Sequence, residues 1–161
     1  MTLDSHSMTI LIVDDDPGHV ELVRRNLRRA GVNNEILAIP NGRDALDYIL
    51  GLDAASANGE PTLANARTDL LILLDINMPG GLDGLEVLRR LKAGPETQKL
   101  PVIMLTTTDD PREIDRCYAL GCNIYITKPV DPSAFIEAVH RLGLFISIVS
   151  MPCEGASGFD V

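Results

Sequence analysis

Several residues that could bind a ligand stand directly after short apolar segments of the chain. Asp14 and Asp15 follow the run TILIV, and Asp75 follows a run of Leu and Ile. Thr106 and Lys128 come after two later apolar runs. If these runs are parallel strands, their carboxyl ends form one edge of the sheet, where such sheets bind ligands. The sequence therefore predicts that these five side chains converge on one site.

The three carboxylates of this set predict a site for a divalent cation. Carboxylates a few ångströms apart repel one another by roughly 1 to 4 kcal/mol for each close pair, and a cation removes that repulsion. Oxygen ligands with retained water suit Mg²⁺, and we expect Mn²⁺ to be able to replace it. An aspartate beside the ion, with one oxygen free, is a competent nucleophile towards a phosphoryl group. Lys128 then offers positive charge to the phosphoryl oxygens, and Thr106 offers a hydroxyl donor.

The bulk composition argues against some functions. With 161 residues the chain has room for one domain, and its formal net charge of -9 argues against a surface that binds a nucleic-acid duplex. No apolar stretch approaches the roughly 18 to 20 residues of a membrane span, and residues 1–8 do not resemble a signal peptide. We therefore expect a cytoplasmic protein with no nucleic-acid or membrane partner, whose 3 cysteines are reduced thiols.

Short apolar runs alternate with segments of helical periodicity along the chain. Five such units predict an α/β fold: a doubly wound, five-stranded parallel sheet with helices on both faces. The expected strands are Thr9–Val13, Glu35–Ile39, Asp69–Leu74, Pro101–Leu105 and Asn123–Thr127. The expected helices begin near Pro17, Gly42, Asp83, Pro111 and Asp131.

One domain is expected over residues 9–150, between an N-terminal tail at 1–8 and a flexible C-terminal tail at 151–161. Residues 51–68, rich in Ala, Asn and Gly, form a long loop within this domain. The loop is either a neutral insertion or a contact for a partner, because loops of this length usually have one of these explanations.

Four strings of the sequence are similar to one known family. They are ILIVDDDP, LLDINMPGGLDGLEVL, PVIMLTT and YITKPV, within about residues 9–142. Together they resemble the receiver domains of two-component response regulators, whose CheY-like, flavodoxin-like fold has the strand order 2-1-3-4-5. The ending LGLFISIVSMP and the long loop also resemble the single-domain regulators paired with bacterial phytochrome kinases. The resemblance implies that the phosphoryl donor is a sensor histidine kinase, for instance a bacteriophytochrome, or a histidine phosphotransfer protein.

The resemblance assigns roles to the acidic residues. Asp75 would be the phosphoacceptor and also a ligand of Mg²⁺. Asp15 would bind the ion directly, and Asp14 would bind it directly or through water. Asn77 would contribute its backbone carbonyl.

A second group would respond to phosphorylation. Thr106 would move towards the phosphoryl group, and Tyr125 would rotate inward behind it. A cis peptide bond before Pro129 would aim Lys128 at the site. Alternatively, Tyr125 simply packs under the fourth helix and is no switch.

The chain departs from the family pattern at two places. Between Asp75 and Gly84 it has one residue more than usual, within the string PGGL, which puts the loop beside the phosphoacceptor in question. Thr107 stands where the family generally has a small residue.

Other polar residues have simpler interpretations. Three aspartates are expected at helix starts: Asp16, Asp109 and Asp110. Three histidines lack companion residues at ligand spacing and are expected at the surface: His6, His19 and His140.

The last helix, expected over residues 133–150, is apolar on more than one side. Exposed patches of this kind usually mark an interface. We expect a homodimer formed through this helix; the alternatives are that the C-terminal tail or the kinase covers the surface. The expected interface residues are Leu142, Phe145, Ile146 and Val149.

Two other functions could use a similar site. A metal-dependent phosphohydrolase with an aspartyl-phosphate generally has a second acid two residues after its nucleophile, and Asn77 cannot act as that acid. A receiver-like interaction module that is never phosphorylated would not need the full set of site residues. The leading prediction is therefore a signalling phosphoacceptor, an enzyme only in catalysing its own phosphorylation and slow dephosphorylation.

Overall fold

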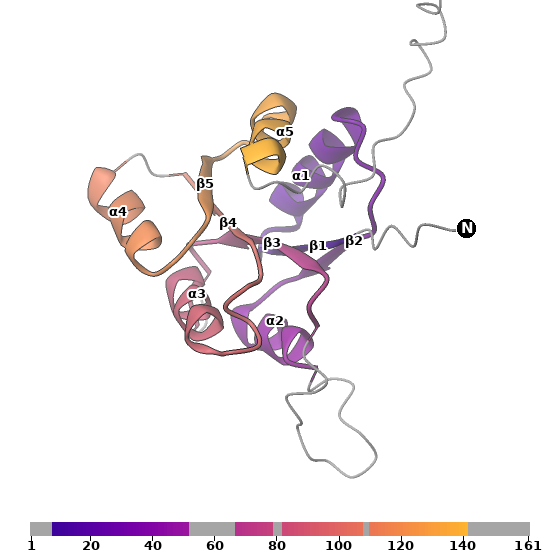
Figure 1. The fold of residues 1–161 in the computed structure, drawn as a ribbon. Coiled ribbons are helices and arrows are strands. Elements are labelled where there is room, and N and C mark those ends of the chain that lie inside the picture. The colour runs from indigo at the N-terminus through magenta and orange to yellow at the C-terminus, as the bar shows by residue number, and fades with distance from the viewer. Residues whose placement is uncertain (1–7, 52–66, 79–81, 108–109, 142–161) are drawn as a thin grey trace, which may run out of the picture.

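A computed structural model describes residues 8–51, 67–78, 82–107 and 110–141 of the chain (Figure 1). The expected interface residues and most of the long loop lie outside these ranges, as do Asp109, His6 and residues 79–81. The side chain of Val139 is not described either.

Five strands and five helices alternate along the described chain, as the sequence predicts. The strands form one parallel sheet in the order β2-β1-β3-β4-β5. The strands are β1 (Thr9–Val13), β2 (Ile36–Ile39), β3 (Leu70–Asp75), β4 (Val102–Thr106) and β5 (Ile124–Thr127). The helices are α1 (Pro17–Arg29), α2 (Gly42–Ile49), α3 (Gly84–Ala93), α4 (Pro111–Ala119) and α5 (Pro132–Arg141).

The sheet is covered on both faces, with α1 and α5 on one side and α2 and α3 on the other (Figure 1). Alternate residues of β1 show the division, because Ile10 and Ile12 pack into the core that includes Leu27 and Phe135. Their neighbours Leu11 and Val13 pack into the second core, with α2 and α3. Strand β3 lies in the middle of the sheet and is buried along its whole length. This explains its almost continuous run of Leu and Ile.

The expected strand bounds are correct to within about one residue. Strands β3 and β4 each extend one residue further than predicted, so that Asp75 and Thr106 are the last residues of their strands. Both polar residues therefore have strand backbone geometry, with Asp75 in register with Leu105 of β4. Their positions are fixed by the sheet and do not depend on a loop.

Aspartate side chains cap the first turns of α1 and α4, as the sequence predicts. The Asp16 carboxylate accepts hydrogen bonds from the backbone amides of Gly18 and His19 at the start of α1. Asp110 accepts from the amide of Arg112 at the start of α4. Both aspartates are N-caps, a role that satisfies amides at the helix start which have no partner within the helix.

Two further features of the described chain bear on the earlier expectations. Cys117 and Cys122 are buried free thiols. Among the helices that the structure describes, none has the length and apolar character needed to cross a bilayer.

Candidate functional site

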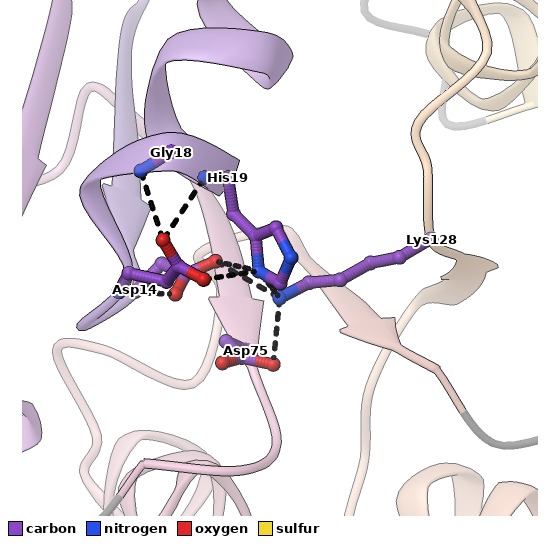
Figure 2. Close-up of polar contacts among 6 residues, drawn as sticks. Asp14, Gly18, His19, Asp75 and Lys128 are labelled. Atoms are coloured by element: carbon purple, nitrogen blue, oxygen red, sulfur yellow. Dashed lines mark hydrogen bonds and ion pairs between the residues drawn. The ribbon is translucent and has the colours of Figure 1, made fainter.

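The carboxyl ends of β1, β3 and β5 bring three charged side chains into contact (Figure 2). The ammonium nitrogen of Lys128, directly after β5, lies 2.9 Å from Asp14 Oδ2 and 3.1 Å from Asp75 Oδ1. Asp14 follows β1, and Asp75 ends β3. The three residues are far apart in the sequence, and only the parallel sheet places them together.

These charges are largely removed from solvent. The side chains of Asp14, Asp75 and Lys128 are 0%, 7% and 8% exposed. Ion pairs at such low exposure are screened much less than surface pairs. One ammonium thus faces two carboxylates, which leaves the inner part of the site with a net negative charge.

Asp14 is held by its own backbone neighbour as well as by Lys128. Its Oδ1 atom accepts a hydrogen bond of 2.9 Å from the amide of Asp16, and its Oδ2 atom accepts one from Lys128. Each carboxylate oxygen has a second lone pair that can bind another group. The carboxylate is therefore fixed in orientation and still able to take part in a cation site.

Burial raises the pKa of the Asp75 carboxyl above its ordinary value of 3.8, because the charged form loses contact with water. The nearby Lys128 ammonium and a hydrogen bond from the backbone amide of Asn77 act in the opposite direction. The Asp14 carboxylate adds to the increase, since two like charges disfavour one another. A bound cation would offset both the loss of hydration at Asp75 and the repulsion between Asp75 and Asp14.

The acidic residues fit a divalent cation. One carboxylate oxygen from each of Asp14, Asp15 and Asp75 lies within 4.8 Å of the other two. Asp15 is exposed, whereas the other two are buried, so the cluster opens to solvent on one side. Hard cations such as Mg²⁺ take a few carboxylate oxygens and retain water in the remaining positions. The donor chemistry and the open side both match that preference.

Gly84, at the first turn of α3, allows the helix to approach the site closely. A Cβ atom at this position would lie 2.1 Å from the backbone oxygen of Asp75 and 2.8 Å from Cα of Ile76. The amide of Gly84 donates a hydrogen bond of 3.0 Å to the Ile76 carbonyl. Only glycine fits here, because the atoms in the way belong to the backbone and cannot move aside.

The remaining expected site residues surround this centre. Thr106 is buried at the end of β4, and its backbone carbonyl accepts a hydrogen bond of 2.7 Å from the amide of Lys128. Asn77 is exposed just beyond β3. The half-buried ring of Tyr125 packs edge-on against Tyr118 of α4, with 5.9 Å between ring centroids. This contact matches the packing interpretation of Tyr125, and a switch role is compatible with it.

Two features of the structure lie just after Lys128. The Lys128–Pro129 peptide bond is cis, as the family resemblance implies. The side-chain amide of Asn26, in α1, donates a buried hydrogen bond of 2.7 Å to the carbonyl of Val130. The sequence analysis did not identify Asn26, because its partner is 104 residues away and no local pattern connects the two.

The expectation for His19 was incomplete. Its side chain is 43% exposed, but its Nδ1 atom lies 3.1 Å from the Lys128 ammonium and 3.8 Å from Asp14 Oδ2. His19 belongs to the site, as Figure 2 shows. A signal was present in the sequence: the residue falls in the first turn of a helix that directly follows a strand end, so it faces the same edge of the sheet.

The family profile of the response regulator receiver domain matches residues 10–140. The chain belongs to this family. Receiver domains are parts of two-component signalling systems, and the sheet order observed here is that of CheY-like receivers. The fold prediction and the family resemblance are therefore both confirmed.

This receiver domain is similar to several solved structures. The receiver domain from Rhodospirillum rubrum is 46% identical, with a TM-score of 0.67, and the match covers 89% of this chain and 96% of that one. The bacteriophytochrome response regulator RtBRR is 31% identical, with a TM-score of 0.71, and the match covers 94% of this chain and 87% of that one.

Response regulator Rcp1 from Synechocystis is 29% identical to this receiver domain over 144 residues, which is 89% of this chain and 92% of Rcp1. The Mn²⁺-bound structure of Rcp1 is 27% identical and has a TM-score of 0.64, covering 91% of this chain and 99% of that one. These relatives are response regulators, so the receiver domain is a signalling module and not an enzyme in the ordinary sense.

Proposed function

We propose that this receiver domain accepts a phosphoryl group on Asp75 and passes on its phosphorylation state through contacts with other proteins. The observation that carries the proposal is the Lys128 ammonium, which lies 3.1 Å from Asp75 Oδ1 beside a cluster of three carboxylates. A buried aspartate next to a fixed positive charge is suited to attack an electrophilic phosphorus. The same ammonium is close enough to contact the phosphoryl oxygens after transfer.

In the proposed reaction, an oxygen of Asp75 forms a bond to phosphorus. The phosphorus–nitrogen bond of a phosphohistidine breaks at the same time, and its electron pair returns to the imidazole of the donor. Lys128 moves one of its hydrogen bonds from Asp75 to an oxygen of the transferred group. Thr106 donates its hydroxyl to another oxygen, and Tyr125 follows by turning inward.

We propose that Asp14, Asp15, Asp75 and the backbone carbonyl of Asn77 hold a Mg²⁺ ion, which Mn²⁺ can replace. The acidic cluster of this chain supports the proposal, and so does the Mn²⁺-bound structure of Rcp1. When bound, the ion neutralises the negative charge that collects on the phosphoryl oxygens.

The proposed donor is a sensor histidine kinase in the cytoplasm, or a histidine phosphotransfer protein. The similarity to RtBRR favours a bacteriophytochrome as that kinase. A phosphohydrolase is less well supported, because Asn77 occupies the place of the general acid and lacks a carboxyl group.

The test is incubation with Mg²⁺ and acetyl phosphate, followed by intact mass measurement. We expect a gain of one phosphoryl group in the wild-type protein and none in Asp75→Asn. Asp115→Asn, at an exposed aspartate of α4, is the matched control and should be modified normally. A full mass gain in Asp75→Asn, or none in the wild type, would refute the proposal.

We also propose that the unit extends over residues 9–150 and forms a homodimer through the C-terminal helix expected over residues 133–150. This proposal comes from the sequence alone, from the apolar residues Leu142, Phe145, Ile146 and Val149. Phe145→Glu should elute as a monomer in size-exclusion chromatography, while the wild type elutes as a dimer. Equal elution of both proteins would contradict the dimer.

A further inference from the structure

The Lys128 ammonium has three hydrogen-bond donors, and the structure places three acceptors around it. Asp14 Oδ2 lies at 2.9 Å, Asp75 Oδ1 at 3.1 Å and His19 Nδ1 at 3.1 Å (Figure 2). An ammonium group has no lone pair to accept a hydrogen bond. A hydrogen bond between the two nitrogens requires that the imidazole accept through Nδ1, which is the tautomer with its proton on Nε2.

We propose that His19 is a positioning residue for phosphoryl transfer: together with Asp14, it holds the Lys128 ammonium while the third hydrogen bond passes from Asp75 to the phosphoryl group. The proposal rests on the function proposed above. It concerns a residue that never touches the phosphoryl group and acts only through Lys128.

The backbone of His19 is well suited to this role. His19 lies in the first turn of α1, and its amide donates a hydrogen bond of 3.4 Å to the capping carboxylate of Asp16. The same carboxylate oxygen also accepts from the amide of Gly18 at 2.9 Å, so two amides of the first turn are held by the cap. The imidazole is thus attached to a rigid element, whereas the ammonium is at the end of a flexible four-carbon chain.

A second anchor is needed because Asp14 alone does not define the position of the ammonium. Asp14 belongs to the acidic cluster, and a cation bound there would share its carboxylate with Lys128 and weaken that hydrogen bond. Lys128 also lines a cavity of about 190 Å³, together with His19, Leu22 and Pro129. Without the imidazole, the lysine side chain has room to turn into this cavity and away from Asp75.

The phosphorylation rates of three variants test the positioning role of His19. His19→Leu removes the acceptor, while His19→Asn keeps an oxygen near the position of Nδ1. His140→Leu makes the same chemical change at an exposed histidine of α5. At saturating Mg²⁺ with acetyl phosphate, we expect phosphorylation to slow by about tenfold in His19→Leu, since a small misplacement of a reacting group has an effect of this order or larger. His19→Asn should stay within about threefold of wild type, and His140→Leu should be unchanged.

The concentration of Mg²⁺ at half-maximal rate separates positioning from damage to the cation site. It should be the same in His19→Leu and in the wild type, because His19 is not a proposed ligand. A wild-type rate in His19→Leu would overturn the proposal. So would an equally slow His19→Asn, or a large shift in the Mg²⁺ requirement.

A measurement without phosphorylation keeps this proposal separate from the function on which it rests. The chain has three lysines, Lys92, Lys99 and Lys128, so ammonium NMR of ¹⁵N-lysine protein is simple to assign with Lys128→Arg. In metal-free protein we expect a protected Lys128 ammonium signal in the wild type and in His19→Asn, and its loss in His19→Leu. A missing wild-type signal, or one unchanged in His19→Leu, would refute the positioning role. If the signals behave as expected but the wild type takes up no phosphoryl group, the proposed function alone fails.

Discussion

At the scale of single residues, the site is a balance between two buried carboxylates and one ammonium. Lys128 pairs with both Asp14 and Asp75, so one negative charge is left without a full partner. Burying the Asp75 charge is unfavourable for the fold, and burial raises the pKa of that carboxyl. The site therefore reduces stability in the absence of a cation, and this property can be measured.

We expect Asp75→Asn to be more stable than the wild type at pH 7 without metal. The gain should be about 1 kcal/mol, since Lys128 and nearby solvent screen part of the cost of burying the charge. The pKa of Asp75 is raised in the folded protein, so the fold binds its proton more tightly than the unfolded chain does. The free energy of unfolding of the wild type therefore falls as pH rises from 3.8, the ordinary pKa of the Asp75 carboxyl, through its raised pKa in the folded protein. Asp75→Asn has no carboxyl at this position and does not show this fall.

Urea unfolding in EDTA at pH 4 and pH 7 measures this effect. The difference in free energy of unfolding between the wild type and Asp75→Asn should be small at pH 4 and larger at pH 7. Asp115→Asn, at the exposed control position, should show no such difference. A wild type that is more stable than Asp75→Asn at pH 7 would mean that the ion pair with Lys128 outweighs the cost of burial.

Gly84→Ala tests the close approach of α3 to the phosphoacceptor strand. Its Cβ atom would collide with backbone atoms of Asp75 and Ile76, so we expect a loss of about 1 to 3 kcal/mol in the free energy of unfolding. Gly18→Ala is the control, since its nearest obstacle is one side-chain oxygen of the exposed Asp16, at 3.2 Å, and no backbone atom. Equal unfolding midpoints for both variants would show that the backbone at Gly84 can move.

At the scale of elements, Asn26 connects α1 to the segment that carries Lys128. Its side-chain amide donates to the Val130 carbonyl in the buried space between α1 and the start of α5. Val130 is two residues after Lys128, so this hydrogen bond holds the backbone close to the lysine. The position of the ammonium therefore depends on a contact between the first and last parts of the described fold.

Asn26→Ala should reduce the free energy of unfolding by about 1 to 3 kcal/mol, because it leaves a buried carbonyl without a partner. Chemical denaturation of Asn26→Ala and of Asn33→Ala, at an exposed position, provides the comparison. We expect the Asn33 variant to unfold within about 0.5 kcal/mol of the wild type. If the two variants behave alike, the hydrogen bond to Val130 contributes nothing to stability.

The sequence predicted elements well where a single local pattern determines them. The apolar run before Asp75 and the spacing of Val20, Val23 and Leu27 are sufficient for a buried strand and an amphipathic helix. The meeting of Asp14, Asp75 and Lys128 followed from the rule that parallel strands share a carboxyl edge.

Local patterns of this kind do not predict which side chains from different elements contact one another. The Asn26 hydrogen bond joins α1 to a loop 104 residues later. The His19 contact depends on the direction in which a long lysine extends from the other side of the site. For His19 the sequence indicates only that the residue faces the site edge of the sheet, and for Asn26 it indicates nothing, since both contacts result from how α1 packs on the completed sheet.

At the scale of the whole molecule, the parallel sheet links cation binding to folding. The three acidic residues come from two strands that are separated by some 60 positions, so the unfolded chain has no preformed site. A ligand that binds only the folded state stabilises it in proportion to the logarithm of its concentration. The proposed Mg²⁺ site should therefore appear as a change in global stability, independent of any phosphorylation.

We expect Mg²⁺ at ten times its Kd to raise the free energy of unfolding by about 1.4 kcal/mol, and EDTA to reverse the gain. Asp15→Asn is the decisive variant, because Asp15 is exposed and has no ion pair in the described part of the chain. Its metal-free stability should be at least that of the wild type, because the change removes one charge from the acidic cluster, while its gain with Mg²⁺ should fall well below 1.4 kcal/mol at the same concentration. Thermal denaturation across a Mg²⁺ titration measures both quantities. An equal gain in the two proteins would place the ion elsewhere, and no gain in the wild type would remove the cation from the proposed mechanism.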